Sequence, residues 1–229
     1  MIKILFALCI WCCALGAAAQ TTQVFVASPT GSSSDIMARF IFDRLESLTG
    51  SRFVIENRSA GFASTALDTV QQAKPDGNTI LVTVSINLIT RKIVRGTVSR
   101  SISTEVSPIT MFASTTSIMV VNSELPVHTV SDLVWYAKRN PNLAYASLGH
   151  GTTQHLVGVQ LAQQSDIVMI HVPYKNINQL LADVVSGRVP MTIQTSPVIS
   201  EYVRRGNLRA LAVLGPARLR EMPTVPTSA

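Results

Sequence analysis

The fold is decided by the stretch Ser28-Pro29-Thr30-Gly31-Ser32-Ser33-Ser34-Asp35, which lies between a strand-like run, Gln23–Ala27, and a helix-like run, Ile36–Leu48. A second turn of the same kind, Ser147-Leu148-Gly149-His150-Gly151-Thr152-Thr153-Gln154-His155, follows the strand-like run Leu143–Ala146 and opens another apolar helix. Strands that alternate with helices through such turns are typical of α/β proteins. The two stretches therefore predict an α/β fold.

The composition of both turns favours an anionic ligand. The start of a helix leaves backbone N–H groups without partners and carries a partial positive charge. Glycine lets a ligand approach the backbone, and two such turns in one chain predict two halves of one anion clamp. Because serine and threonine are also ordinary helix caps, a purely structural role remains the alternative. The turn residues expected to bind the ligand are Ser28, Thr30, Gly31, Ser32, Ser33, Ser34, Asp35, Ser147, Gly149, Gly151, Thr152, Thr153 and His155.

Three of the candidate residues carry expectations of their own. Asp35 would repel an anion if it faced inward, so we expect its carboxylate to face the backbone of its own loop and to favour the helix start. Ser85 and Tyr174 follow strands, at the sheet edge where open α/β sheets place their ligands. Turn chemistry for Ser85 and packing for Tyr174 are equally good explanations.

The rest of the chain repeats the alternation, and we expect largely parallel sheets. Thr129, with Asp132 three residues later, predicts a capped helix start. Residues 88–108 show no regular pattern. Further strands are expected at Arg52–Glu56, Thr79–Val84, Met119–Asn122, Val168–Val172, Met191–Thr195 and Leu208–Leu214, and further helices at Ser64–Lys74, Val130–Arg139, Asn178–Ser186 and Pro197–Arg205.

The composition excludes several classes of function. Hydrophobic residues make up 47% of the chain and charged residues 14%, which excludes a disordered protein. The net charge of +6 is spread thinly, and no basic stripe with interleaved aromatic residues is present. We therefore expect no nucleic-acid partner, whereas a mildly positive field suits a small anion.

The first residues have the form of a secretory signal. Lys3 precedes the apolar run Ile4–Leu15, and Ala17-Ala18-Ala19 offers a cleavage pattern, so we expect a signal peptide at 1–19, a mature chain from Gln20 and a periplasmic location. A membrane anchor is the weaker alternative because the apolar run is short. All three cysteines fall in this segment, and none has the context for lipid attachment. The mature chain is thus expected to have no thiol chemistry.

Metal and catalytic patterns are absent from the sequence. His150 and His155 are five residues apart, no carboxylate or cysteine accompanies them, and His171 is expected in a strand. We expect His155 to support the second turn. The nucleophile motif G-x-S-x-G does not occur. The sequence therefore predicts no metal, no cofactor and no enzymatic activity.

Seven collinear segments carry a family resemblance. They are Ser28–Asp35 with Met37-Ala38-Arg39, Val54–Arg58, Lys74–Leu81, Tyr145–Thr152 with His155-Leu156, His171–Lys175, Gly206–Val213 and Met222–Thr227. On these segments the chain resembles the tripartite tricarboxylate transporter receptors, the Bug family of extracytoplasmic solute-binding proteins.

The resemblance implies a type II periplasmic-binding-protein fold, in which two α/β lobes joined by crossover strands close over a solute. It implies a first lobe of residues 20–115 and 213–229 and a second lobe of residues 116–212, with one turn in each lobe. Family members continue for roughly half a lobe more, so we expect an incomplete first lobe. The family holds a solute carboxylate with main-chain N–H groups and hydroxyls, partly through water, and uses little fixed charge.

The resemblance further implies a receptor for a small carboxylate, which could be a di- or tricarboxylate, an amino acid or an aromatic acid. The implied partners are the membrane permease subunits of a tripartite transporter. We expect the receptor itself to be a monomer. A truncated, vestigial or signalling receptor without transport activity is the alternative.

Overall fold

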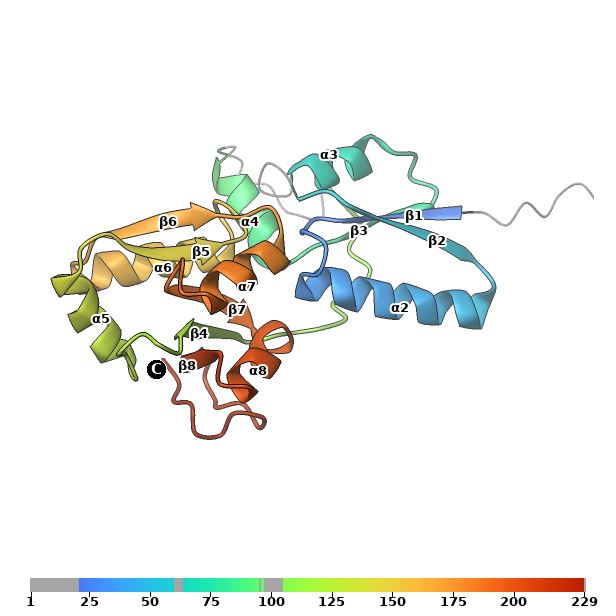
Figure 1. Ribbon diagram of the computed structural model, residues 1–229. Helices are drawn as coiled ribbons and strands as arrows, with labels where there is room; N and C mark the ends of the chain where they lie inside the picture. The colour runs from blue at the N-terminus through green and yellow to red at the C-terminus, as the bar shows by residue number, and fades with distance from the viewer. Residues whose placement is uncertain (1–20, 60–63, 95, 97–104, 229) are drawn as a thin grey trace, which may run out of the picture.

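The computed structural model describes residues 21–59, 64–94, 96 and 105–228, so the predicted signal segment lies outside the described residues. The described chain forms two sheets, one of three strands in the order β2-β1-β3 and one of five strands in the order β6-β5-β7-β4-β8. The two sheets form separate regions that lie side by side (Figure 1). We call them the first and the second lobe.

The first lobe has a parallel sheet of β1 (Thr21–Val26), β2 (Arg52–Asn57) and β3 (Thr79–Val82). Helices α2 (Ser33–Thr49) and α3 (Ser64–Gln72) cover its two faces (Figure 1). Successive side chains of a strand point to opposite faces. In β1 and just after it, Val24 and Val26 accordingly pack in one hydrophobic cluster with Phe42 of α2, while Phe25 and Ala27 pack in another with Ala66 of α3.

A helix that the sequence did not predict, α4 (Ser85–Val94), follows β3. Its Arg91 is 4% exposed and makes ion pairs of 2.6 Å with both Asp68 and Glu105. Asp68 lies in α3, 23 residues before Arg91, and Glu105 lies 14 residues after it, so neither ion pair is visible in the helical periodicity of α4. Tertiary contacts of this kind override weak local preference.

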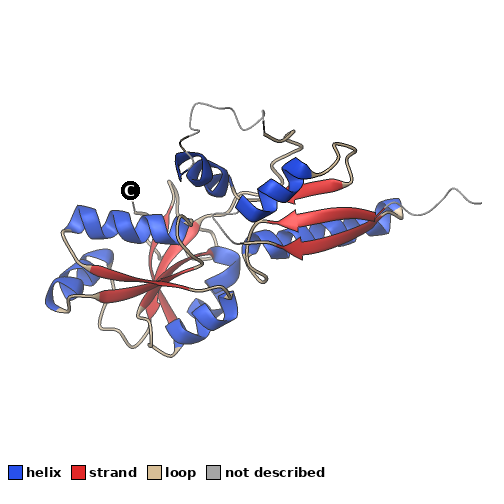
Figure 2. Ribbon diagram, turned by 90° about the horizontal axis from the view of Figure 1, so that it is seen from above, coloured by secondary structure: helices blue, strands red, loops and turns tan. Residues whose placement is uncertain are grey.

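The second lobe is larger and has helices on both faces of its sheet (Figure 2). Its strands are β4 (Ser117–Asn122), β5 (Leu143–Ser147), β6 (Met169–Pro173), β7 (Met191–Thr195) and β8 (Leu208–Leu214). Its helices are α5 (Val130–Arg139), α6 (Thr153–Ser165), α7 (Ile177–Val185) and α8 (Ser196–Arg204). The predicted capping box of Thr129 and Asp132 is present at the start of α5 and is confirmed.

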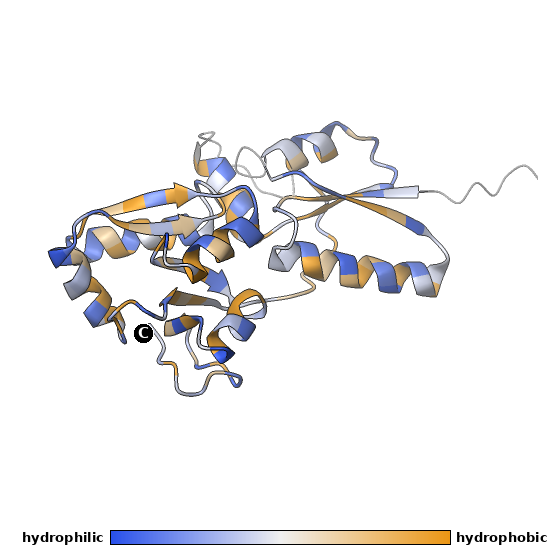
Figure 3. Cartoon of the chain, in the orientation of Figure 1, coloured by the Kyte–Doolittle hydropathy of each residue, from blue (hydrophilic) through white to orange (hydrophobic). Residues whose placement is uncertain are grey.

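The sheet of the second lobe is mixed, where we expected largely parallel strands. β5 pairs in parallel with β6 and β7, but β4 runs antiparallel to both β7 and β8. β4 separates two cores by simple alternation: Ile118 and Val120 pack towards α7 and α8, and Met119 and Val121 pack towards α5 and α6. Figure 3 shows hydrophobic colouring along strands of this lobe and on parts of the helices that cover them.

The last residues differ from the expected lobe boundaries. Val213 belongs to β8, its N–H donates to the carbonyl of Pro226 at 2.8 Å, and it forms a parallel bridge with Thr227. Met222 and Val225 are buried in the same core as α7 and α8. Residues 213–228 therefore pack on the second lobe and do not return to the first, because their apolar side chains complete its core.

The connection between the lobes also differs from expectation. Among the described residues, the segment 105–116 leads from the first lobe to β4, and the chain from β4 to residue 228 stays in the second lobe. The resemblance implied that crossover strands join the two lobes. Within the described ranges, no helix is both long and apolar enough to cross a membrane.

Candidate functional site

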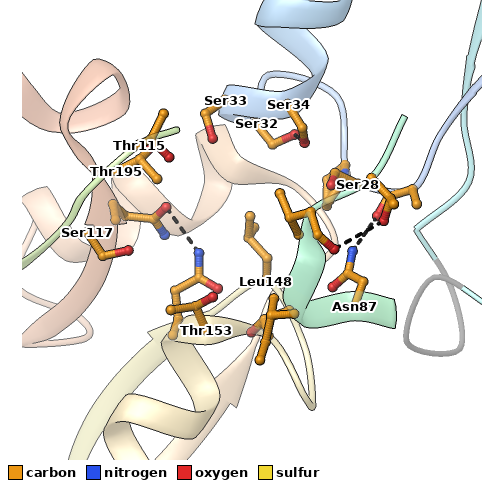
Figure 4. Close-up of a pocket in the computed structure, with 18 of the residues that line it drawn as sticks. Ser28, Ser32, Ser33, Ser34, Asn87, Thr115, Ser117, Leu148, Thr153 and Thr195 are labelled. Carbon is orange, nitrogen blue, oxygen red and sulfur yellow. Dashed lines mark hydrogen bonds between the residues drawn. The ribbon is translucent and has the colours of Figure 1, made fainter. Parts of the chain in front are cut away.

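A cavity of about 1170 Å³ lies between the lobes. The first lobe contributes residues that follow β1 and β3, the second contributes residues that follow β5, β6 and β7, and the segment 110–115 adds a further wall. Figure 4 shows Ser32, Ser33 and Ser34 on one side of it and Thr153 and Leu148 on another. The cavity therefore takes the place at the carboxyl ends of the strands where α/β proteins bind their ligands.

Four helices begin at this cavity. Their first residues or caps line it: Ser32 for α2, Ser85 for α4, Thr152 for α6 and Thr195 for α8. Each helix start contributes partial positive charge and free N–H groups. Among the described lining residues, Lys175 carries the only formal charge and no carboxylate is present. The cavity is thus suited to an anion held mainly by neutral donors.

Asp35 organises the first loop from behind. Its Oδ2 accepts the Gly31 N–H at 2.8 Å, and its Oδ1 accepts Nδ2 of Asn57 at 2.9 Å and pairs with Arg39 at 3.0 Å. Burial raises the pKa of Asp35, but these hydrogen bonds and the Arg39 charge outweigh it and hold the pKa below its usual value. Asp35 is 2% exposed and does not line the cavity. The expectation that it faces its own loop is confirmed.

Two other residues of the first loop also lie off the cavity. Thr30 is exposed and donates to Oδ1 of Asn57 at 3.2 Å. Gly31 has a φ of 79°, and a Cβ placed there would lie 2.8 Å from Cγ2 of Ile177 in the second lobe. Gly31 is therefore required where the two lobes touch. The predicted residues of this loop that do line the cavity are Ser28, Ser32, Ser33 and Ser34.

The second loop divides in the same way. Gly149, Thr152 and Thr153 line the cavity, while Ser147, Gly151 and His155 do not. The fully buried Ser147 accepts the Gly149 N–H at 2.9 Å through its Oγ. Nδ1 of His155 accepts the Gly151 N–H at 3.3 Å, so this histidine supports the loop as predicted.

The loop also contacts the first lobe. The Gly151 carbonyl accepts a hydrogen bond from Oγ1 of Thr90 in α4 at 3.1 Å. Together with the approach of Gly31 to Ile177, this bond makes each loop touch the opposite lobe. Ser147, Gly151 and His155, which do not line the cavity, therefore fix the shape and the position of the second loop.

Ser85 and Tyr174 both line the cavity. Ser85 is the first residue of α4. Tyr174 is 9% exposed, and its hydroxyl donates a hydrogen bond to Oδ2 of Asp183 at 2.8 Å. Tyr174 therefore packs in the second lobe as well as lining the cavity. Burial and the Asp183 carboxylate raise the pKa of this tyrosine to about 12. Its hydroxyl stays protonated and already engaged, which leaves its ring edge to shape the cavity.

Sequence reasoning missed Thr195, which caps α8 without a side-chain cap bond. Its Oγ1 is buried, lacks a hydrogen-bond partner among the described residues, and belongs to a residue that lines the cavity. Buried polar atoms are rarely left unpaired, so this hydroxyl is available to a ligand. The signal was present: Thr195-Ser196-Pro197 is a third small-residue turn between a strand and a helix.

Two further lining residues, Asn87 and Gln194, were also missed. Nδ2 of Asn87 donates to the Ala27 carbonyl at 3.1 Å, and Oε1 of Gln194 accepts from Nε2 of Gln154 at 3.5 Å (Figure 4). No local pattern distinguishes either residue, because each reaches the cavity only through the tertiary arrangement.

The structure brings together three histidines that the spacing along the chain did not group. His150, His155 and His171 each place one ring nitrogen within 4.8 Å of the others. His171 reaches the group because β6 pairs in parallel with β5, which puts it opposite Tyr145. Burial, with a smaller effect from the neighbouring His155 and His150, lowers the pKa of His171 to about 4, and burial also lowers the pKa of His155. At neutral pH the ring of His171 is uncharged.

Comparison with known proteins agrees with this geometry. Residues 37–229 match the family model described as the tripartite tricarboxylate transporter family receptor. A relative from Pseudomonas sp. strain P51, described as a UPF0065 protein in the tcbD-tcbE intergenic region, is 30% identical over 88% of this chain and 60% of its own length. The chain spans about three fifths of the length of the curated relatives that it matches.

Solved structures are similar throughout the described chain. One described as a periplasmic transporter has a TM-score of 0.83 and 26% identity, covering 93% of this chain and 71% of that one. Another, R. palustris Rpa4515 with adipate, has a TM-score of 0.78 and 28% identity, covering 92% and 71%. The type II periplasmic-binding-protein fold expected from the sequence is thereby confirmed. On its family match and its fold, this chain belongs to the tripartite tricarboxylate transporter receptor family.

Proposed function

We propose that the protein is a non-enzymatic periplasmic receptor that captures a small carboxylate and delivers it to the permease subunits of a tripartite tricarboxylate-type transporter. The observation that carries the proposal is the convergence of four helix starts on one cavity whose described lining has no carboxylate. A helix start is a ready anion site, and several aimed at one ligand add their partial charges. Receptor delivery to a permease is supported by the family description.

Short dicarboxylates are the first solutes to test. The similar structure of R. palustris Rpa4515 with adipate supports this class. Two carboxylates on one solute would let one end meet the first loop and the other end meet the helix starts of the second lobe. Contact with both loops favours the closed arrangement of the lobes, since a ligand stabilises the state that it binds better.

The experiment is isothermal titration calorimetry of the purified chain with adipate and a panel of di- and tricarboxylates, amino acids and aromatic acids. The neutral diamide of adipate is the matched control for charge. We expect saturable binding of at least one carboxylate at one site per chain and no binding of the diamide. A folded chain that binds no member of the panel contradicts the proposal, as does equal affinity for adipate and its diamide.

Two variants, one in each loop, test the contacts. The hydroxyls of Ser33 and Thr153 line the cavity, whereas Ser32 and Thr152 cap helices and would change stability as well. Ser33→Ala and Thr153→Val should each weaken binding about five-fold, the loss of one neutral hydrogen bond of about 1 kcal/mol. Replacement of the exposed Ser51 by alanine is the matched control and should leave affinity unchanged.

A further inference from the structure

Three imidazole rings meet beside the second loop. His150 lies in the turn, His155 in the first turn of α6 and His171 in β6. The ring centroids are 4.5 to 5.1 Å apart in all three pairs, and one nitrogen of each ring lies within 4.8 Å of the other two. Three separate segments of the chain thus bring one ring nitrogen each close together.

We propose that His150, His155 and His171 bind a divalent transition-metal ion of the zinc type. Imidazole nitrogen is a preferred ligand of zinc, copper and nickel. Three histidines with an open fourth position form a known class of zinc site. This site does not depend on the proposed solute, because its ligands and those of the cavity overlap only at His150.

The bonds around His171 are compatible with a metal ligand. Its Nε2 lies 2.5 Å from Oγ of Ser147, and this oxygen can donate its own proton to the Gly149 carbonyl at 3.1 Å. In that arrangement Nε2 of His171 carries the ring proton and donates it to Ser147. Nδ1 then has a free lone pair for the ion. The hydrogen bond from Nε2 to Ser147 then orients the His171 ring. In most histidine metal sites, the ring nitrogen that does not bind the metal makes such a hydrogen bond.

His155 links the ion to the second loop. Its Nδ1 now accepts the Gly151 N–H through a long bond of 3.3 Å. If Nδ1 binds the ion, its lone pair is used; if Nε2 binds the ion, the ring proton moves to Nδ1. Either way the Gly151 bond is released, and Gly151 also accepts from Thr90 of the first lobe. Metal binding would therefore act on the contact between the lobes.

The rings need only a small movement to reach metal-binding distances. Zinc bound to nitrogen at about 2.1 Å in a tetrahedron places its ligands about 3.4 Å apart, so separations of up to 4.8 Å must shorten by up to about 1.4 Å. His150 is exposed and lies in a turn, so rotation of its side chain supplies this movement. It also lines the cavity, so an ion can reach the cluster from the solvent through the cavity.

The test is calorimetric titration of the full chain with zinc chloride after removal of metal by a chelator. The protein carries no polyhistidine tag, and Cys9, Cys12 and Cys13 are changed to serine in every sample so that thiols do not compete. We expect one zinc ion per chain. Replacement of zinc by cobalt should give the visible absorption of a tetrahedral ion with nitrogen ligands.

The variants His150→Ala and His155→Gln should each weaken zinc binding by at least ten-fold, the usual effect of losing a ligand or its support. His128, exposed and outside the cluster, provides the control His128→Ala, which should bind as the parent does. Thermal unfolding followed by circular dichroism confirms that each variant is folded. Absence of saturable zinc binding, or equal binding by the parent and folded His150→Ala, overturns the proposal.

Discussion

The two loops have similar sequences and line the same cavity, yet different chemistry holds each in shape. A carboxylate, Asp35, anchors the first loop through Gly31, Asn57 and Arg39. Imidazoles and a buried hydroxyl anchor the second loop, with His155 bonded to Gly151 and His171 to Ser147. A cavity suited to an anion can therefore lie beside a carboxylate, provided that the carboxylate faces away from the cavity and accepts hydrogen bonds from its own loop and its neighbours.

The largest expected effect comes from removing the anchor of the first loop. Asp35→Ala leaves the Gly31 N–H and the Asn57 amide without their acceptor, and hydrogen bonds to a buried charge are among the strong ones. We expect the free energy of unfolding in urea to fall by about 3 kcal/mol. Asp43→Ala, in the same helix at an exposed position, should change it by less than about 0.5 kcal/mol. Equal stability of the two variants would break the comparison.

The second loop depends on close packing beneath it. Gly158 of α6 lies against the ring of Tyr145, and a Cβ at this position would lie 2.3 Å from Cε2. We expect Gly158→Ala to lower the free energy of unfolding by about 2 kcal/mol, because overpacking outweighs the better helix propensity of alanine. In a Tyr145→Leu background the same change should cost less. A stabilising effect of Gly158→Ala in the parent would refute the tight packing.

The contributions of His171 in the second loop and Asp35 in the first loop to the free energy of unfolding should change over different ranges of pH. The pKa of His171 in the fold, about 4, lies below its unfolded value of 6.5, so the unfolded chain binds more protons between these values. Its contribution is complete above about pH 6.5 and is lost as the pH falls towards 4, with an expected loss on the order of 1 kcal/mol. The lowered pKa of Asp35 preserves its contribution until the pH falls below about 4.

Urea unfolding at several pH values, in a buffer with a metal chelator, checks this difference. The parent chain should lose stability between pH 6.5 and 4.5 more steeply than His171→Gln, and His128→Gln should follow the parent. Parallel stability curves for the parent and His171→Gln would show that the second loop has no such dependence.

The smallest effect on stability is expected at Thr195. Its Oγ1 has no hydrogen-bond partner among the described residues, so Thr195→Val removes nothing that the fold uses. Stability should change by less than about 0.5 kcal/mol, whereas affinity for the carboxylate should fall about five-fold. Calorimetry and urea unfolding of the same sample separate the two outcomes. A large loss of stability with unchanged affinity would reverse the assigned role.

Local patterns were enough to predict most elements. Two predicted strands and one helix coincide with the structure, Met191–Thr195, Leu208–Leu214 and Val130–Arg139, and the predicted run Leu143–Ala146 falls one residue short of β5. Val130–Arg139 has a clear cap, and the three strands are short runs rich in apolar residues between turns. Helix α4 was missed because its buried Arg91 depends on distant carboxylates, and the antiparallel placement of β4 depends on the path of the chain between the lobes.

The candidate site was predictable at the level of its loops but not of every residue. Hydroxyls at the starts of α2, α4 and α6 line the cavity, because these helices begin at the edge of the sheets where the cavity lies. The sequence could not distinguish the residues that support the loops from those that line the cavity. Ser147 and Thr152 both carry hydroxyls, and it is their burial that differs. The histidine cluster likewise depends on the pairing of β5 with β6, which cannot be predicted from the spacing of histidines along the chain.

The central claim is that both loops bind one carboxylate, and NMR titration of the 15N-labelled chain tests it most directly. The amide resonances of Ser33 and Ser34 in the first loop and of Thr153 and Gln154 in the second report on each wall of the cavity. With the dicarboxylate that binds best, we expect all four to shift along one saturation curve with a single dissociation constant. Shifts confined to one loop, or two curves with different constants, would contradict the claim.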